Sequence, residues 1–155
     1  MKQDWKEVLK NKKSKEELIT EESFTIGRIV YMPLKESDGL TTTKGYESRK
    51  KYFVIVGFTA DGDAVGVLLI NHEPNDSTEE LGDCQFPVSP KDYDFLNEKS
   101  WLDCSYIAEP IDKERIKKEG LNKGTLTPED VELVMDFIVK TQAITNKTKR
   151  KFGII

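Results

Sequence analysis

The stretch that decides the fold is Tyr52-Phe-Val-Ile-Val-Gly-Phe58, followed by Thr59-Ala-Asp-Gly-Asp63 and then Ala64-Val-Gly-Val-Leu-Leu-Ile-Asn71. The first run is almost continuously apolar and β-branched, which predicts a strand that is covered on both faces. Asp61-Gly62 tolerates the positive φ that a tight turn requires. We therefore expect a β-hairpin with strands at 52–58 and 64–70.

Three further strands are expected around this hairpin. Residues 25–32 alternate β-forming side chains and are followed by Pro33, which we expect to end the strand. Residues 83–88 form a short strand, and Pro87 places it at the edge of the sheet. Residues 101–107 form the fifth strand, and residues 92–96 a short helical turn between the last two.

A helix is expected after Thr127-Pro128. Thr127 is a good N-cap, Pro128 suits the first helical position, and the acidic residues that follow complement the helix dipole. Its apolar stripe comprises Val131, Val134, Met135, Ile138 and Ala143. We expect this stripe to pack in the core. Residues 1–20, with Trp5, Val8 and Leu9, predict a leading helix outside the main fold.

Composition points to one small domain in the cytoplasm. The chain has 155 residues, of which 37% are hydrophobic and 34% are charged. No apolar run approaches the roughly 20 residues of a membrane span, and residues 1–6 lack the apolar region of a secretion signal. We therefore expect no membrane contact, and reduced thiols at Cys84 and Cys104.

The charge is unevenly distributed. A net charge of −4 argues against nonspecific coating of nucleic acid, yet lysines are concentrated near both ends of the chain. If the ends meet, they form a local positive patch. The simpler interpretation is two solvated tails.

Five short strands and a packed helix predict a mainly β fold with α elements, a small SH3-like curved β-barrel. The organisation expected is an N-terminal helical extension at 1–22, a barrel domain at 23–144 and a basic C-terminal tail at 145–155. The C-terminal helix belongs to the barrel domain.

Four blocks of the chain, in order, resemble the MazF/PemK family of toxin endoribonucleases. They are the hairpin, Ser100-Trp-Leu-Asp-Cys-Ser-Tyr-Ile107, Ile111-Asp-Lys-Glu-Arg-Ile116 and Gly124-Thr-Leu-Thr-Pro-Glu129. The resemblance covers about residues 24–140. It implies a MazF/PemK/CcdB-like barrel and metal-independent cleavage of single-stranded RNA without a cofactor. It also implies a homodimer and an antitoxin protein as partner.

The same resemblance directs attention to the two ends of the hairpin, at residues 49–51 and 71–72, and to the strand expected at 101–107. Cleavage requires a base for the ribose 2′-OH, an acid for the leaving oxygen and a cation for the developing phosphorane charge. We expect Arg49, His72 and Ser105 to be catalytic, and Lys50, Lys51, Asn71 and Asp103 to bind substrate. The unperturbed pKa of histidine, roughly 6.5, suits acid–base work.

An alternative function follows from where the chain departs from the family pattern. The Arg-Pro pair of the family lacks its proline here, and no arginine stands on the strand before Ile111. A domain that binds a protein or nucleic acid without turnover would show these differences. His72, Asn71 and the basic run 49–51 would then be ordinary surface residues. One histidine and two cysteines match no zinc-binding spacing, so we expect no metal site.

Overall fold

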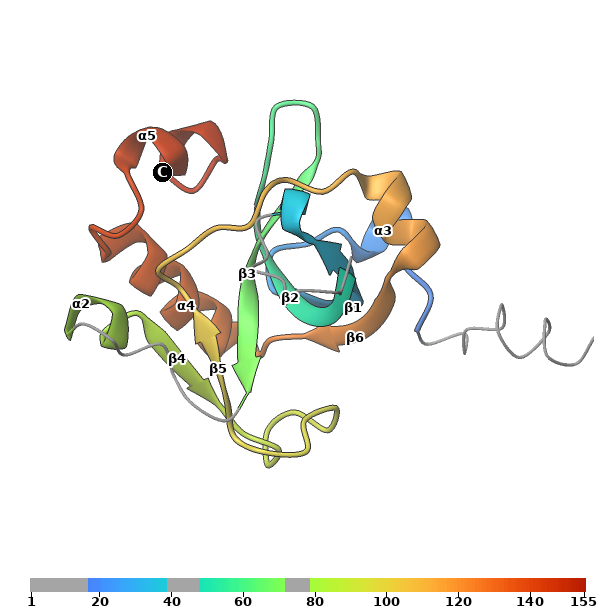
Figure 1. The fold of residues 1–155 in the computed structure, drawn as a ribbon, viewed down its shortest axis with the longest axis horizontal. Helices are drawn as coiled ribbons and strands as arrows, with labels where there is room; N and C mark the ends of the chain where they lie inside the picture. The colour runs from blue at the N-terminus through green and yellow to red at the C-terminus, as the bar shows by residue number, and fades with distance from the viewer. Residues whose placement is uncertain (1–16, 39–47, 72–78) are drawn as a thin grey trace, which may run out of the picture.

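The computed structural model describes residues 17–38, 48–71 and 79–155. It is mainly β, with a six-stranded antiparallel sheet that curls into a half-barrel in the order β4-β5-β3-β2-β1-β6 (Figure 1). The strands are β1 (Arg28–Lys35), β2 (Ser48–Phe58), β3 (Ala64–Asn71), β4 (Gln85–Val88), β5 (Ser100–Asp103) and β6 (Leu121–Thr125).

Four α-helices accompany the sheet in the described part of the chain. They are α2 (Glu79–Gly82), α3 (Lys113–Glu119), α4 (Pro128–Lys140) and α5 (Asn146–Lys151), with short 3-10 turns at Glu21–Ser23 and Glu36–Asp38. None of them has the length and apolar composition that a membrane span requires. The helix expected over residues 1–20 lies almost wholly outside the described residues.

The predicted hairpin is confirmed. β2 and β3 pair antiparallel, with Phe53 opposite Leu68, and Gly62 turns the chain at a φ of 91°. Gly66 lets the strands pack closely, because a Cβ at this position would lie 2.3 Å from the ring of Phe53. Both faces of β2 are covered, as its continuous apolar run predicted.

The prediction that Pro33 ends its strand is wrong, since β1 continues to Lys35. β6 pairs with β1 only as far as Tyr31, so Pro33 lies where β1 has β2 as its one neighbour. The missing N–H of Pro33 therefore costs no bond between strands. Its carbonyl oxygen accepts a hydrogen bond from Arg115 at 3.1 Å instead.

The strands after the hairpin are shorter than expected. β4 lies at the sheet edge with Pro87 opposite Trp101, as predicted. β5 ends at Asp103, four residues before the predicted end at 107, because the chain turns at Cys104 and Ser105. Residues 92–96 form turns rather than a helix.

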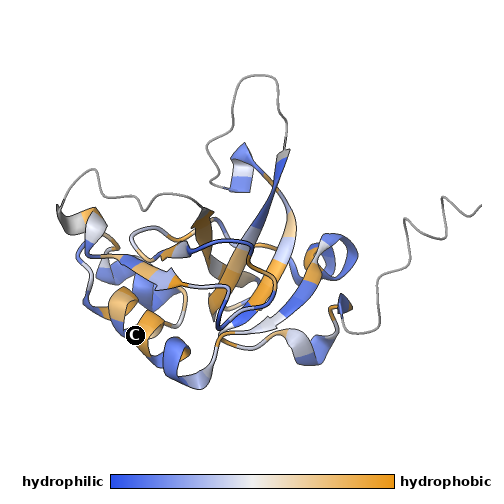
Figure 2. Ribbon diagram, turned by 90° about the horizontal axis from the view of Figure 1, so that it is seen from below, coloured by the Kyte–Doolittle hydropathy of each residue, from blue (hydrophilic) through white to orange (hydrophobic). Residues whose placement is uncertain are grey.

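Two hydrophobic clusters cover the two faces of the sheet. The larger one joins β3 to α4 and α5 through residues such as Val67, Val134 and Phe152, and the smaller one joins β1 and β2 to Ile116 of α3. α3 consequently lies on one side of the sheet, and α4 with α5 on the other (Figure 1). Figure 2 shows hydrophobic residues concentrated where the strands cross the middle of the molecule.

α4 begins as predicted. The Thr127 hydroxyl accepts from the Asp130 N–H at 3.2 Å, and Pro128 occupies the first turn. Val134 and Ile138 are buried, with Val131 and Met135 packed beside them. Ala143 does not belong to this stripe, because the helix ends at Lys140 and Ala143 is exposed.

The basic C-terminal segment is not a solvated tail. Residues Asn146–Lys151 form α5, and Phe152 lies in the larger hydrophobic cluster. The Lys149 side chain is only 2% exposed, and its ammonium group donates to the carbonyl oxygens of Val139 at 2.8 Å and Thr141 at 2.7 Å. The last carbonyl oxygens of a helix lack donors within the helix, and the Lys149 ammonium supplies one at the end of α4. This contact explains how so charged a segment folds onto the domain.

Candidate functional site

The register of β1 and β2 divides the basic run 49–51 between the two faces of the sheet. The ladder runs without interruption from Ile29 opposite Val54 to Lys35 opposite Ser48. Because side chains alternate along a strand, Arg49 and Lys51 share the face of Phe53, and Lys50 lies on the opposite face with Tyr52. The three neighbouring charges therefore do not form one patch.

β3, β5 and β4 add residues to the face that carries Arg49 and Lys51. Directly paired residues point to the same side of a sheet. Phe53 pairs with Leu68, which in turn pairs with Asp103, and Ile70 pairs with Trp101. We call the surface formed by Arg49, Lys51, Ile70, Trp101 and Asp103 the basic face.

β2 and β3 separate at the end of the sheet that bears the basic face. Their pairing ends at Phe53 and Leu68, whereas β2 continues along β1 to Ser48 and β3 continues along β5 to Asn71. Arg49 and Lys51 therefore stand on a ribbon of two strands, β1 and β2. Trp101 stands across the divergence, on β5.

The cations of the basic face have no acidic partner among residues 17–38, 48–71 and 79–155. Every ion pair in this part of the chain involves other lysines and Arg115. Burial and, to a smaller extent, the charge of Arg49 lower the pKa of Lys51. A partly buried cation beside a second one, with no acidic partner in the described ranges, is favourable for binding an anion.

Trp101 supplies an aromatic surface on the basic face. Its side chain is partly exposed, and the Lys99 ammonium lies 5.5 Å from the centroid of its ring. Pro87 and Ile70 flank it on the neighbouring strands. An aromatic ring with a cation beside it is the arrangement on which nucleobases stack in single-strand binding proteins.

Asp103 and Ser105 are brought together, but they bind each other. The Asp103 carboxylate accepts hydrogen bonds from Gln85 Nε2 at 2.9 Å, from the Ser105 N–H at 3.1 Å and from the Ser105 hydroxyl. Ser105 is 8% exposed. Ser105 was expected within the strand at 101–107, whereas the structure folds it back in a turn after β5. These contacts fix the exit of β5 and engage both groups internally.

Three predicted site residues, Asn71, His72 and Lys50, lie apart from Arg49, Lys51 and Asp103 or outside the described residues. Asn71 occupies the last position of β3, opposite Ser100. His72 lies outside the described residues. Lys50 is exposed on the face opposite Arg49 and Lys51, the face on which Tyr52 stacks on Tyr31 with ring centroids 4.4 Å apart.

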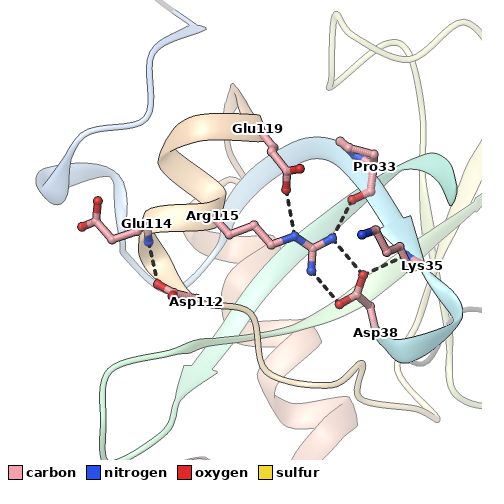
Figure 3. A network of polar contacts seen from close by, with 7 residues as sticks. All are labelled: Pro33, Lys35, Asp38, Asp112, Glu114, Arg115 and Glu119. Atoms are coloured by element: carbon pink, nitrogen blue, oxygen red, sulfur yellow. Dashed lines mark hydrogen bonds and ion pairs between the residues drawn. The ribbon is translucent and has the colours of Figure 1, made fainter.

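A polar network that the sequence did not reveal positions the end of β1. Arg115 of α3 donates to both oxygens of Asp38, to Glu119 and to the Pro33 carbonyl (Figure 3). The hydrogen bonds from Arg115 lower the pKa of Asp38 and raise that of Arg115. Arg115 belongs to the motif Ile111–Ile116, and nothing in that motif identifies Asp38 as its partner.

Within the described ranges, no cluster of three or more histidine, cysteine, aspartate and glutamate side chains is suited to hold a metal ion. A comparison with models of protein families gives no match to this chain. A comparison with curated proteins likewise finds no matching sequence.

Proposed function

We propose that the protein binds single-stranded RNA on the basic face and cleaves it without a metal ion, as a MazF/PemK-like endoribonuclease. The observation that supports this most directly is the pair Arg49 and Lys51, which share one sheet face and lack a carboxylate partner in the described chain. Two such cations neutralise neighbouring phosphates and release their counterions, which favours nucleic-acid binding. Because the net charge of the chain is −4, we expect attraction of RNA at the basic face and not over the whole surface.

In the proposed reaction, the ribose 2′-OH attacks the adjacent phosphorus and the 5′-oxygen of the next nucleotide leaves. Arg49 is permanently charged and stabilises the phosphorane. Lys51, whose pKa is lowered by burial and by Arg49, exchanges a proton more readily than an exposed lysine. His72 is the second acid–base group in this proposal, because an imidazole side chain suits proton transfer near neutral pH.

Trp101 is proposed to hold a base of the RNA strand next to the cleaved phosphate. β3 separates β5 from β2, so Lys51 and Trp101 lie on either side of the divergence of β2 and β3. The RNA strand is proposed to cross this divergence, with a phosphate at Lys51 and a base at Trp101. Stacking accepts any base, so this contact adds affinity without demanding a sequence.

The order of the motifs also supports a proposal about the type of barrel and the biological role of the protein. The barrel would be of the SH3-like MazF/PemK/CcdB kind, and the protein a cytoplasmic homodimer in a toxin–antitoxin system. An antitoxin protein would then block the RNA-binding face. The blocks at 111–116 and 124–129 and the curled sheet support this assignment.

A second candidate is a domain that binds RNA or a protein without turnover. The mutual hydrogen bonds of Asp103 and Ser105 favour it, because both groups are already engaged and Ser105 is buried. Under this alternative, Arg49, Lys51 and Trp101 would still bind the strand. A test for RNA cleavage therefore distinguishes the two candidate functions.

The decisive experiment incubates a long, mostly unstructured RNA with purified protein in EDTA. Wild type is compared with Arg49→Ala, Lys51→Ala and His72→Ala, and Lys50→Ala is the matched control from the opposite face. Cuts that disappear in Arg49→Ala and persist in Lys50→Ala would support the ribonuclease and its face. Binding without cuts would favour the second candidate. Neither binding nor cuts by folded wild type would refute both RNA-binding proposals and leave only the domain that binds a protein.

A further inference from the structure

Cys84 and Cys104 lie opposite each other at the end of the β4–β5 ladder. Gln85 pairs with Asp103, and one step further the Cys104 N–H donates to the Cys84 carbonyl at 3.0 Å. Both side chains belong to the larger hydrophobic cluster, and both are thiols in this structure. We propose that Cys84 and Cys104 form a reversible intramolecular disulfide when the protein is exposed to a peroxide.

The backbone geometry is compatible with such a bond. One hydrogen bond joins the two backbones, since the Cys84 N–H donates to the Leu81 carbonyl instead. Residues directly opposite each other in an antiparallel pair have Cα atoms about 4.5–5.5 Å apart. Disulfides join Cα atoms separated by roughly 4.4–6.8 Å. Because both side chains enter the same cluster, the sulfur atoms already point to one side of the sheet. Bond formation therefore requires side-chain rotation rather than movement of either strand.

Access to the two thiols differs. Cys84 lines a hollow of about 540 Å³ beside the end of α4, together with Asp83, Phe137 and Thr141. Cys104 is fully buried, and burial, followed by the charges of Asp103 and Cys84, raises its pKa to about 12. Cys84 is therefore the thiol that an oxidant reaches first, and Cys104 is the resolving thiol.

The proposed chemistry has two steps. The Cys84 sulfur attacks hydrogen peroxide, the O–O bond breaks, and a sulfenic acid and one water are produced. The Cys104 sulfur then attacks the Cys84 sulfur, the S–O bond breaks, and the hydroxyl leaves as a second water with the thiol proton. Peroxide is reduced and the two thiols are oxidised together.

The disulfide would alter the junction of α4 and α5. In the reduced protein, Cys84 Sγ lies 3.0 Å from the Thr141 hydroxyl oxygen, and Thr141 is the C-cap of α4. The Thr141 carbonyl also accepts from the buried Lys149 ammonium. Turning the Cys84 sulfur toward Cys104 breaks the contact with Thr141. Oxidation is thus expected to loosen the attachment of α5.

The test uses the full chain, reduced, desalted, treated with hydrogen peroxide, then denatured and alkylated with N-ethylmaleimide. Intact mass should show the loss of two hydrogen atoms and no maleimide, with both thiols restored by dithiothreitol. Cys104→Ala should leave Cys84 as a sulfenic acid that dimedone traps. Cys84→Ala should leave Cys104 unoxidised. Alanine is chosen because a serine hydroxyl would be buried, and circular dichroism checks the fold of each variant.

Three results would overturn the proposal. They are two intact thiols in treated wild type, disulfides that only link separate chains, and oxidation of Cys104 at the wild-type rate in Cys84→Ala. Amide hydrogen exchange on the oxidised protein tests the coupling. Faster exchange across residues 146–152 supports it, and unchanged exchange in fully oxidised protein refutes it.

Discussion

The guanidinium of Arg115 donates to both carboxylate oxygens of Asp38, at 2.7 Å and 2.9 Å, across 77 residues of sequence. A bidentate pair of this kind is stronger and more directional than a single ionic contact. The carboxylate of Asp38 also accepts from the Lys35 N–H at 2.7 Å. The pair therefore joins α3 to the 3-10 turn at Glu36–Asp38, directly after β1.

Asp38→Asn is expected to lower the free energy of unfolding by about 2 kcal/mol at pH 7, between the effects of exposed and buried ion pairs. The hydrogen bonds of Arg115 lower the pKa of Asp38, so the stabilisation is complete above the ordinary carboxyl pKa and is lost as pH falls through the lowered value. Urea unfolding at several pH values checks this. A difference between variant and wild type that stays constant down to pH 2 would contradict it.

Lys51→Met is expected to stabilise the protein while weakening RNA binding. Burial and Arg49 lower the pKa of Lys51 from 10.5, so the folded state disfavours its charge at neutral pH. Removing the charge should raise the free energy of unfolding, and the gain should narrow as pH rises toward the ordinary lysine pKa. The slope of log affinity against log salt should fall by about one.

Lys50→Met is the matched control for that prediction, because Lys50 is exposed and faces the other side of the sheet. It should change neither the urea midpoint nor the salt slope appreciably. Equal effects of the two substitutions on RNA affinity would remove the distinction between the faces.

Trp101→Ala is expected to weaken binding of single-stranded RNA by about 1–3 kcal/mol, the usual contribution of one stacked base. Trp101→Phe should retain most of the affinity, since the ring face is kept. Fluorescence anisotropy with a labelled unstructured RNA measures both. An alanine variant with wild-type affinity would place the strand elsewhere.

Lys149→Met is expected to destabilise the fold by about 3 kcal/mol. The substitution leaves the Val139 and Thr141 carbonyls at the end of α4 without the ammonium that now donates to them. Lys147→Met, on the exposed side of α5, should have an effect below about 0.5 kcal/mol. Thermal unfolding of both variants is the measurement, and similar melting temperatures would contradict the proposed role of Lys149.

Strong local signals predicted the hairpin and α4 well. The apolar run of β2 and the Thr127-Pro128 cap specify their elements without help from distant residues. β6 gave no such signal, because Leu121–Thr125 contains a single large apolar residue and joins the sheet through its backbone bonds to β1. α3 buries only Ile116, and α5 is held by a buried lysine, so neither shows the apolar stripe of an amphipathic helix.

The site was predicted as a set of residues but not as a surface. Residues 49–51 read as one basic run, and only the pairing with β1 assigns Lys50 to a different face. Asp103 and Ser105 were both expected to serve the site, yet the turn after β5 directs Ser105 toward the Asp103 carboxylate. Trp101 was counted as a strand residue, and its position across from Ile70 depends on a pairing between β3 and β5 that local sequence does not encode.

A one-residue insertion in the first half of β2 would exchange the sheet faces on which the residues before it lie. Arg49 would then move to the side now occupied by Lys50, while Phe53, which is fully buried, keeps the rest of the strand in place. The number of residues before Phe53 therefore decides which charges of this segment face the divergence of β2 and β3. The distance along the chain to Phe53 thus matters to the basic face as much as the charges themselves do.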